Sequence, residues 1–236
     1  MVDKKLILTL VTVVYNEYEN IEETILSVVE NLNHNVEYII IDGGSTDGTV
    51  DIIKKYNDKI TYWISEPDRG IYDAMNKGIE YANGSWIINI NAGDKLLTIP
   101  YDELKDAELN NFDALCGCVL TKNNIIVKPR YDWRIKLYNT LPHQGLFYKK
   151  DRMYSKYNLR YKIFSDFAYN IGMYKRKQTV YLTDMIISFH SLDGISNHSS
   201  NSNELLSVVY EMGNIFSFLA SYLRFKWLGL ISRLKK

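Results

Sequence analysis

The chain has 236 residues, 46% of them hydrophobic, and its 28 Lys and Arg residues balance its 28 Asp and Glu residues. A chain of this size and composition can bury a sizeable core. This excludes global disorder and fits one large α/β domain, or one domain with a small appendage. The balanced charge argues against a nucleic-acid-binding protein, because such proteins normally carry a basic excess.

Two further features bear on where the protein works. No run of about 20 uninterrupted apolar residues is present, so no membrane span is predicted, and the N-terminal residues lack the cleavage site of a signal peptide. Cys116 and Cys118 lie in one apolar run and are too close in sequence for a favourable disulfide. We interpret them as core residues of a reduced, cytoplasmic protein.

The first 95 residues alternate short apolar runs with amphipathic ones. Nearly continuous apolar runs are typical of strands that are covered on both faces of a parallel sheet. Strands are predicted at residues 6–15, 37–41, 60–65 and 85–90, and helices at 21–32, 49–56 and 71–82. This alternation predicts βαβ units, and therefore an α/β fold with a Rossmann-like, mostly parallel sheet flanked by helices.

After Asp94 the alternation loosens, and a mixed second half is expected. Strands are predicted at residues 112–120, 124–128, 146–149 and 179–188, a helix at 163–175, and a polar loop at 191–203. Residues 121–123 are expected to form the hairpin turn between the first two of these strands.

The C-terminal tail, residues 204–236, mixes large apolar side chains with a basic excess toward its end. This pattern predicts an amphipathic basic helix. Such a helix either lies on an anionic membrane surface or packs against the domain or a partner chain. The sequence favours neither alternative.

Polar side chains follow each of the four predicted strands of the first half, in the segments 15–17, 42–49, 66–70 and 91–94. Ligands bind at the carboxyl ends of the strands of an open parallel sheet, so these segments predict a ligand site on one rim. For residues 42–49 alone, turn and helix-cap chemistry is an equal alternative. The glycines spell neither GxGxxG nor a Walker motif, so neither a dinucleotide-binding dehydrogenase nor a P-loop NTPase is indicated.

Together these segments resemble the family 2 glycosyltransferases, which have the GT-A fold. The resemblance covers about residues 6 to 198, and it rests on TVVYNEYENIEETILSV, YIIIDGGSTDGTVDII, SEPDRGIYDAMNKGIEYANGSWIININAGD, LPHQGLFYKKD, FSDFAYNIGM and DGISN. SEPDRGIYDAMNKGI is similar to bacterial members that build capsule, exopolysaccharide and O-antigen chains. The resemblance implies a GT-A domain at residues 1–203, with a nucleotide-sugar-binding half at 1–95 and an acceptor half at 96–203, followed by the helical tail 204–236.

The resemblance also implies which residues bind the donor. Tyr15 would stack on the base, and the Asp42 carboxylate would accept a base N–H, with uridine the expected base. Arg69 would meet the base or a phosphate; the alternative is a surface ion pair with Asp68 or Glu66. The full set of expected donor-binding residues is Val13, Tyr15, Glu17, Asp42, Arg69, Asn91, Gly93 and Asp94.

The acidic metal motif of the family corresponds to Asn91-Ala92-Gly93-Asp94, which retains a single carboxylate. Asp94 is therefore the expected ligand for Mn²⁺ or Mg²⁺, which are hard cations that prefer oxygen. The metal would bridge the donor phosphates and offset charge on the leaving nucleoside diphosphate. Gly93 departs from the family pattern, because an acid that contacts the ribose often stands there. His198 is expected to reach the diphosphate or the metal.

The catalytic base is expected in the second half. Family members carry an acid at the start of a helix that faces the cleft, and Ser165-Asp166 matches this feature. Asp166 would activate the acceptor hydroxyl; the alternative is that Asp166 or Ser165 only caps the helix. By resemblance, His143 and Gln144 line the acceptor side of the cleft.

Three functional hypotheses follow. The first is an inverting glycosyltransferase that passes a sugar from a nucleotide sugar to a saccharide acceptor, expected to be lipid-linked, in surface polysaccharide synthesis at the inner face of the membrane. The second is a catalytically silent sugar-nucleotide-binding protein, which Gly93 favours. The third is a nucleotidyltransferase, although TVVYNEYEN lacks the Gly-rich signature with a Lys that such enzymes carry. No nucleic-acid partner is expected under any of them.

Overall fold

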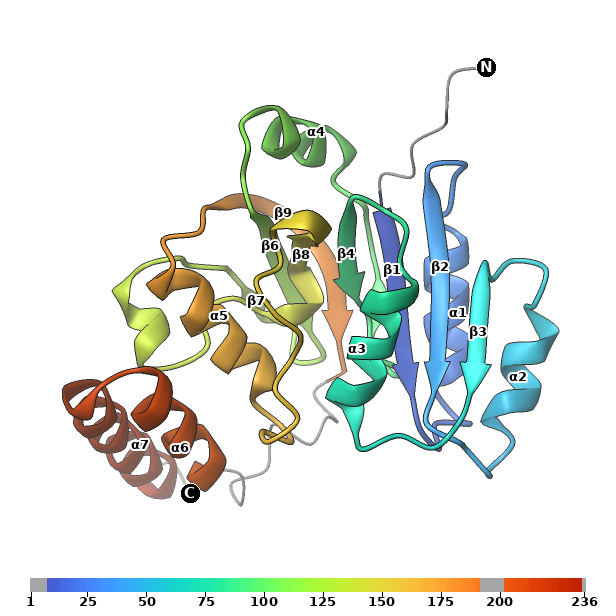
Figure 1. The fold of residues 1–236 in the computed structure, drawn as a ribbon. Helices are drawn as coiled ribbons and strands as arrows, with labels where there is room; N and C mark the ends of the chain where they lie inside the picture. The colour runs from blue at the N-terminus through green and yellow to red at the C-terminus, as the bar shows by residue number, and fades with distance from the viewer. Residues whose placement is uncertain (1–7, 192–201, 235–236) are drawn as a thin grey trace.

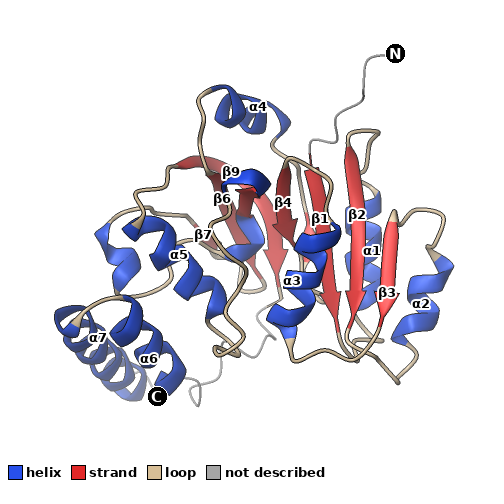
Figure 2. Ribbon diagram, viewed as in Figure 1, coloured by secondary structure: helices blue, strands red, loops and turns tan. Residues whose placement is uncertain are grey.

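The computed structural model describes residues 8–191 and 202–234. Within these residues, nine strands form one sheet with the order β3-β2-β1-β4-β8-β6-β9-β5, and β7 pairs with β6 outside this path (Figure 1). Helices cover both faces of the sheet (Figure 2). The predicted α/β class is therefore confirmed.

The first half of the sheet is parallel, as its apolar strands predict. β1 (Leu8–Val14) pairs with β2 (Val36–Asp42) and with β4 (Trp86–Asn89), and β2 pairs with β3 (Tyr62–Ser65). The carboxyl ends of these strands point the same way (Figure 1), so the loops that follow them meet at one rim.

The side chains of β1 alternate between two apolar cores. Leu8 and Leu10 pack with α1 (Ile21–Val29) and α2 (Thr49–Lys55) on one face. Val11 and Val13 pack with α3 (Ile71–Tyr81) on the other face, which α3 covers in Figure 1. Because both faces are buried, the strand is apolar throughout rather than alternately apolar and polar.

Gly78 allows α3 to lie close to β1. A Cβ at this position would lie 2.4 Å from Cγ1 of Val11, which is far inside van der Waals contact. α3 starts at Ile71, soon after the carboxyl end of β3. Its first turn, which carries Tyr72, is therefore held at the rim of the sheet.

The second half of the sheet is mixed, as expected. β4 pairs antiparallel with β8 (Leu146–Lys149), β8 pairs antiparallel with β6 (Ala114–Thr121), and β6 runs parallel to β9 (Val180–His190). The shorter elements of this half are β5 (Lys95–Leu96), β7 (Ile126–Val127), the 3₁₀ turns η1 (Trp133–Lys136), η2 (His143–Gly145) and η3 (Lys150–Arg152), and helix α5 (Ser165–Lys175). The antiparallel pairing of β6 with β7 confirms the predicted hairpin.

Helix α4 (Tyr101–Leu109) is not predicted by the sequence. Only Leu104 and Ala107 of this helix are buried, so its apolar pattern is too short to recognise. Cys116 and Cys118 are free cysteines, as expected, and burial raises the pKa of the Cys116 thiol well above its ordinary value.

The tail forms two helices rather than the single one expected, α6 (Ser202–Met212) and α7 (Ile215–Leu234). Gly213 and Asn214 separate them, because glycine and asparagine end helices readily. Val208 and Val209 of α6 are fully buried against Phe167 of α5, so α6 packs on the domain. No helix in the ranges 8–191 and 202–234 combines the length and apolar character needed to cross a bilayer.

Candidate active site

The loops after β1 and β2 are joined by hydrogen bonds into one surface. The backbone N–H of Asn16 donates to Ser45 Oγ at 2.7 Å, and the Thr46 N–H donates to Asn16 Oδ1 at 2.9 Å. The Tyr18 N–H donates to Asp47 Oδ2 at 3.0 Å. The polar segments after two separate strands therefore form one continuous part of the rim, as predicted from their positions at strand ends.

Asp42 is fully buried and orders the loop that follows it. One carboxylate oxygen accepts the backbone N–H of Gly44 at 3.1 Å and of Ser45 at 2.9 Å, and the Ser65 hydroxyl also donates to it. These donors come from the ends of β2 and β3. The carboxylate thus fixes the geometry of the β2–α2 loop.

The other donor-side residues differ in exposure. Tyr15 is 62% exposed, and its ring and the Asp68 carboxylate both lie against Gly43. The carboxylate of Glu17 accepts the amide N–H of Asn20 at 2.9 Å. Val13 is 4% exposed and belongs to the core, so its side chain does not reach the rim.

Arg69 forms an ion pair with Asp73 in the first turn of α3, at 3.0 Å between Nη2 and Oδ1. The suggested pairing with Asp68 or Glu66 is therefore wrong; Glu66 instead pairs with Lys77 at 2.7 Å. The spacing of four residues between Arg69 and Asp73 favours this pair. The Arg69 side chain is 73% exposed, so its guanidinium is accessible from the solvent.

Asp94 is 3% exposed and lies in a turn closed by its N–H bond to the Asn91 carbonyl at 3.0 Å. Gly93 within this turn has φ of +92°, a conformation that disfavours any residue with a Cβ. The glycine in place of the usual acid is thus explained by the backbone. One carboxylate oxygen of Asp94 contacts His190 Nδ1 at 2.8 Å, and the other accepts the Gln144 amide N–H at 3.2 Å.

Asp166 lies in the first turn of α5, as predicted, and is 7% exposed. No side-chain cap bond is formed at this helix end, so the interpretation of Ser165 or Asp166 as a cap is not supported. Instead, Asp166 Oδ1 lies 2.7 Å from the Tyr72 hydroxyl, whose single proton it shares with the Ile163 carbonyl oxygen at 2.6 Å. The other oxygen, Oδ2, accepts the Asn139 amide N–H at 3.1 Å. Three elements distant in sequence thus converge on this carboxylate.

His143 lies between the two acidic residues of the rim. Its Nε2 is 3.0 Å from the Asn91 amide nitrogen, and its Nδ1 is 3.8 Å from Asp166 Oδ2. Because the amide nitrogen can only donate, Nε2 accepts and the neutral ring carries its proton on Nδ1. Burial lowers the pKa of His143, against the opposing effect of Asp166 and Asp94, which agrees with a neutral ring.

Three residues of this arrangement are not among the predicted site residues: Tyr72, Asn139 and His190. Tyr72 and His190 are visible in the sequence, within SEPDRGIYDAMNKGI and at the edge of the loop 191–203. Asn139 carries no local signal. The expected contact His198 lies outside the described residues, and its role stays a prediction.

A divalent metal would meet oxygen ligands at this rim. The Asn91 amide oxygen is buried and has no hydrogen-bond partner within the described part of the chain, and Asp94 is three residues away. The described residues contain no cluster of three or more His, Cys, Asp and Glu side chains that could enclose a metal. One or two protein oxygens beside substrate phosphates are nevertheless a usual set for Mg²⁺, so the residues fit such an ion.

The fold and the rim define an α/β enzyme of the GT-A class. Residues 9–177 match the family described as Glycosyl transferase family 2, so the chain belongs to this family and is a glycosyltransferase. A PGL/p-HBAD biosynthesis glycosyltransferase of Mycobacterium tuberculosis (strain ATCC 25177 / H37Ra) is 29% identical over 173 residues, which cover 68% of each chain. The putative teichuronic acid biosynthesis glycosyltransferase TuaG of Bacillus subtilis (strain 168) is 34% identical over 98 residues, which cover 40% of this chain and 39% of TuaG.

Solved structures confirm the fold. A crystal structure of S. aureus TarS superposes with a TM-score of 0.67 at 16% identity; the match covers 86% of this chain but only 38% of TarS. The mannosyltransferase PcManGT of Pyrobaculum calidifontis, in complex with GDP-Man and Mn²⁺, matches with a TM-score of 0.63 at 15% identity, over 86% of this chain and 63% of that protein. At these identities the likeness establishes the GT-A fold alone.

Proposed function

We propose that this chain is an inverting glycosyltransferase that moves a sugar from a UDP-sugar to a lipid-linked saccharide during assembly of a surface polysaccharide. The observation that carries the proposal is the contact of His143 with both Asn91 and Asp166. It brings the end of β4, where the family binds the donor diphosphate, next to the helix start that carries a buried carboxylate. A transferase must hold the donor diphosphate close to the base that activates the acceptor.

In the proposed reaction, the acceptor hydroxyl oxygen attacks the anomeric carbon of the donor and forms the new glycosidic bond. Asp166 accepts the hydroxyl proton, and the bond between the anomeric carbon and the diphosphate oxygen breaks. The bonding pair leaves with the nucleoside diphosphate. A single displacement of this kind inverts the anomeric configuration.

Asp94 and the amide oxygen of Asn91 would hold Mn²⁺ or Mg²⁺, with donor phosphates as further ligands. When bound, the ion offsets the negative charge of the leaving diphosphate. His190 and Gln144 hold the Asp94 carboxylate in place. His198 stays our predicted further contact to this group.

The donor base is proposed to stack on the exposed ring of Tyr15, beside the loop that Asp42 orders. The complex of TarS with UDP-GlcNAc supports a uridine donor. Arg69, exposed at the start of α3, would meet the base or a phosphate. Residues 1–95 then form the donor half and residues 96–203 the acceptor half.

The relatives support an acceptor in polysaccharide or glycolipid synthesis, because their names refer to PGL/p-HBAD and to teichuronic acid. We propose that the enzyme works in the cytoplasm, on the inner face of the membrane. The tail is proposed to hold it there through its basic residues and through the apolar side chains that α7 exposes.

A panel of UDP-, GDP- and dTDP-sugars, each with and without Mn²⁺, tests this function. We expect UDP-sugars with Mn²⁺ to raise the melting temperature most, and to be hydrolysed slowly with release of UDP. Asp94→Ala should remove the part of the stabilisation that depends on Mn²⁺. Asp151→Ala is a matched control, because Asp151 is exposed on η3.

Two outcomes would contradict the proposal. Release of pyrophosphate from a sugar phosphate and a nucleoside triphosphate would indicate a nucleotidyltransferase. Binding of donors with no release of nucleoside diphosphate, even with membrane extracts as acceptors, would indicate a silent binding protein. An unchanged Mn²⁺ dependence in Asp94→Ala would refute the ligand assignment alone.

A further inference from the structure

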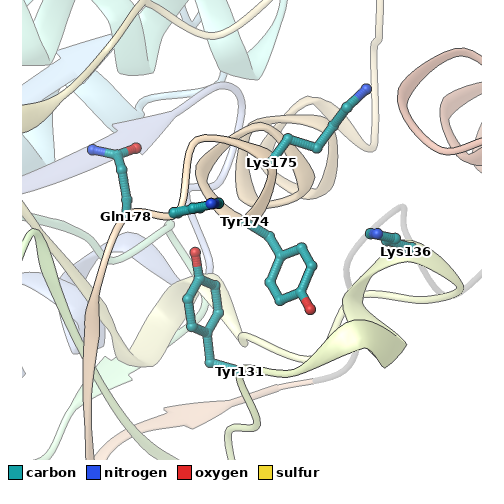
Figure 3. A pocket seen from close by; sticks show the side chains of 6 residues that line it. Tyr131, Lys136, Tyr174, Lys175 and Gln178 are labelled. Carbon is teal, nitrogen blue, oxygen red and sulfur yellow. The ribbon is translucent and has the colours of Figure 1, made fainter.

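A pocket lies at the opposite end of α5 from Asp166. It has a volume of about 540 Å³ and is lined by Tyr131, Lys136, Tyr174, Lys175, Lys177 and Gln178 (Figure 3). Tyr131 and Tyr174 meet edge to face, with ring centroids 5.6 Å apart. Tyr174 is eight positions after Asp166 in α5, which corresponds to a rise of about 12 Å along the helix.

Two polar atoms of this pocket are buried and have no hydrogen-bond partner in the described part of the chain, the Tyr131 hydroxyl and the amide oxygen of Gln178. The Gln178 amide nitrogen is already committed, because it donates to the Arg152 carbonyl at 2.8 Å. Leaving a buried polar atom unpaired costs folding free energy, so native proteins contain few such atoms. Those that remain often have a functional role, such as binding a ligand. Two side chains that line the pocket therefore carry an unpaired polar atom, one a donor and one an acceptor.

The three lysines around the pocket differ in the partners that they contact. Lys175 donates to the Met212 carbonyl of α6 at 2.9 Å and, as Figure 3 shows, points away from the tyrosine pair. Lys136 lies over the Tyr174 ring at 5.2 Å. Neither Lys136 nor Lys177 has an acidic partner among residues 8–191 and 202–234. Asp113, whose charge adds to the effect of burial in raising the pKa of Tyr131, accepts the backbone N–H of Thr179 at 2.7 Å. Asp132, next to Tyr131 in the sequence, pairs with Arg134 at 2.9 Å.

The same two segments form this pocket and hold the proposed base. Asn139, which donates to Asp166, lies in the same segment as Tyr131, and α5 (Ser165–Lys175) carries both Asp166 and Tyr174.

We propose that the pocket is a second saccharide subsite, which binds an acidic sugar of the acceptor chain away from the reacting end. The tyrosines offer apolar ring surface to the sugar, Gln178 and Tyr131 bond its hydroxyls, and Lys136 and Lys177 meet its acid group. The choice of a saccharide rests on the proposed function.

Binding of hexagalacturonate, an acidic hexasaccharide, is measured by titration calorimetry on the full chain without donor, with neutral maltohexaose as the comparison. We expect hexagalacturonate to bind, and maltohexaose to bind at least tenfold more weakly. Tyr131→Phe removes one hydrogen bond and should weaken binding about tenfold. It also removes an unpaired buried hydroxyl, so the melting temperature should rise by about 2–4 °C. Lys177→Gln should reduce the preference for the acidic probe, because Lys136 alone then meets the acid group.

The matched control is Tyr56→Phe, because the Tyr56 hydroxyl is paired with Glu22 at 2.8 Å; it should lower the melting temperature and leave saccharide binding unchanged. UDP release in the donor panel should be the same in all these variants, so a failure of this inference is distinct from a failure of the proposed function. Equal affinity for both hexasaccharides, or a Tyr131→Phe variant that melts lower and binds normally, would overturn the inference.

Discussion

At the scale of single residues, the site depends on a carboxylate that is held in one orientation. Asp166 accepts hydrogen bonds from Tyr72 and Asn139 on its two oxygens, and it is 7% exposed. Asp166→Asn keeps the shape but removes the basic oxygen. We expect transfer to fall by about 10²–10⁴-fold, the usual contribution of a general base, with donor affinity unchanged within about twofold. Asp151→Asn, on the exposed η3 turn, is the control, and transfer at the wild-type rate by Asp166→Asn would refute the assignment.

Tyr72 is a positioning residue for this carboxylate. Burial and the neighbouring Asp166 raise the pKa of Tyr72 well above its ordinary value, so the phenol keeps its proton and stays a donor. Tyr72→Phe removes the hydrogen bond and leaves the ring in place. The same change removes the contact of this hydroxyl with the Ile163 carbonyl, next to the start of α5. We expect kcat to fall about tenfold while KM for the donor stays constant, because both lost contacts hold the base and its helix rather than the donor. Tyr101→Phe, on the distant α4, should change neither constant. An increase in KM with constant kcat would assign Tyr72 to donor binding instead.

The sequence predicts the acids of the site but not their partners. Asp94 and Asp166 stand next to recognisable strand and helix ends, so their positions at the rim follow from chain order. Tyr72 lies 94 residues from Asp166, and Asn139 lies 27 residues from it. These pairings depend on how α3 and α5 pack against the sheet, and no local pattern encodes that. The sequence likewise does not indicate that Arg69 pairs with Asp73, because Glu66, Asp68 and Asp73 are all close to it in the chain.

At the scale of elements, α6 is attached to the segment that leads into α5. The Glu204 carboxylate accepts the backbone N–H groups of Lys162, Ile163 and Phe164, at 3.1, 2.8 and 2.9 Å. Glu211 accepts a bidentate pair from Arg160 at 3.0 and 2.9 Å. The first helix of the tail therefore supports the start of the helix that carries Asp166.

Glu204→Gln weakens this attachment, because a neutral amide oxygen is a poorer acceptor for three N–H groups. We expect a loss of about 2 kcal/mol in the free energy of unfolding, which corresponds to a fall of about 4–8 °C in melting temperature. Calorimetry measures this change. Glu30→Gln at the exposed end of α1 is the matched control. A melting temperature equal to that of the control would show that α6 does not stabilise the domain.

The predictability of the elements follows their apolar patterns. The elements from β1 to β4 follow distinct apolar runs separated by polar segments, and the sequence predicts each of them, including the short strands β3 and β4. Helix α4 buries only Leu104 and Ala107, so periodicity did not reveal it. The sequence pattern does not reveal the division of the tail at Gly213 and Asn214, because apolar residues continue on both sides. A short Gly-Asn break is a weaker signal in the sequence than the long apolar pattern around it.

At the scale of the whole molecule, the tail lies on the same lower side of Figure 1 as the carboxyl ends of the parallel strands. An ordinary surface helix buries its apolar side chains and exposes its polar ones. On α7, two serines are buried and several large apolar side chains are exposed. Ser217 and Ser221 are 8% and 2% exposed, and Ser221 donates to the Leu137 carbonyl at 2.9 Å. Phe216 and Leu223 are 77% and 66% exposed on another side of the helix. Basic residues follow in the sequence at positions 224, 226, 233, 235 and 236.

An apolar surface beside a basic sequence is suited to the interface of an anionic bilayer. We therefore expect the protein to float with vesicles that contain about one third phosphatidylglycerol, and to float less with pure phosphatidylcholine, because part of the attraction is electrostatic. Burial of a Phe or Leu side chain contributes about 1.5–3 kcal/mol. Replacing Phe216 and Leu223 together by Ser should then lower the bound fraction at least tenfold while UDP release in solution stays constant. Leu109→Ser is the matched control, since Leu109 is 78% exposed on the distant α4. If the double variant floats as the wild type does, α7 contacts a protein partner or none, and the membrane assignment fails.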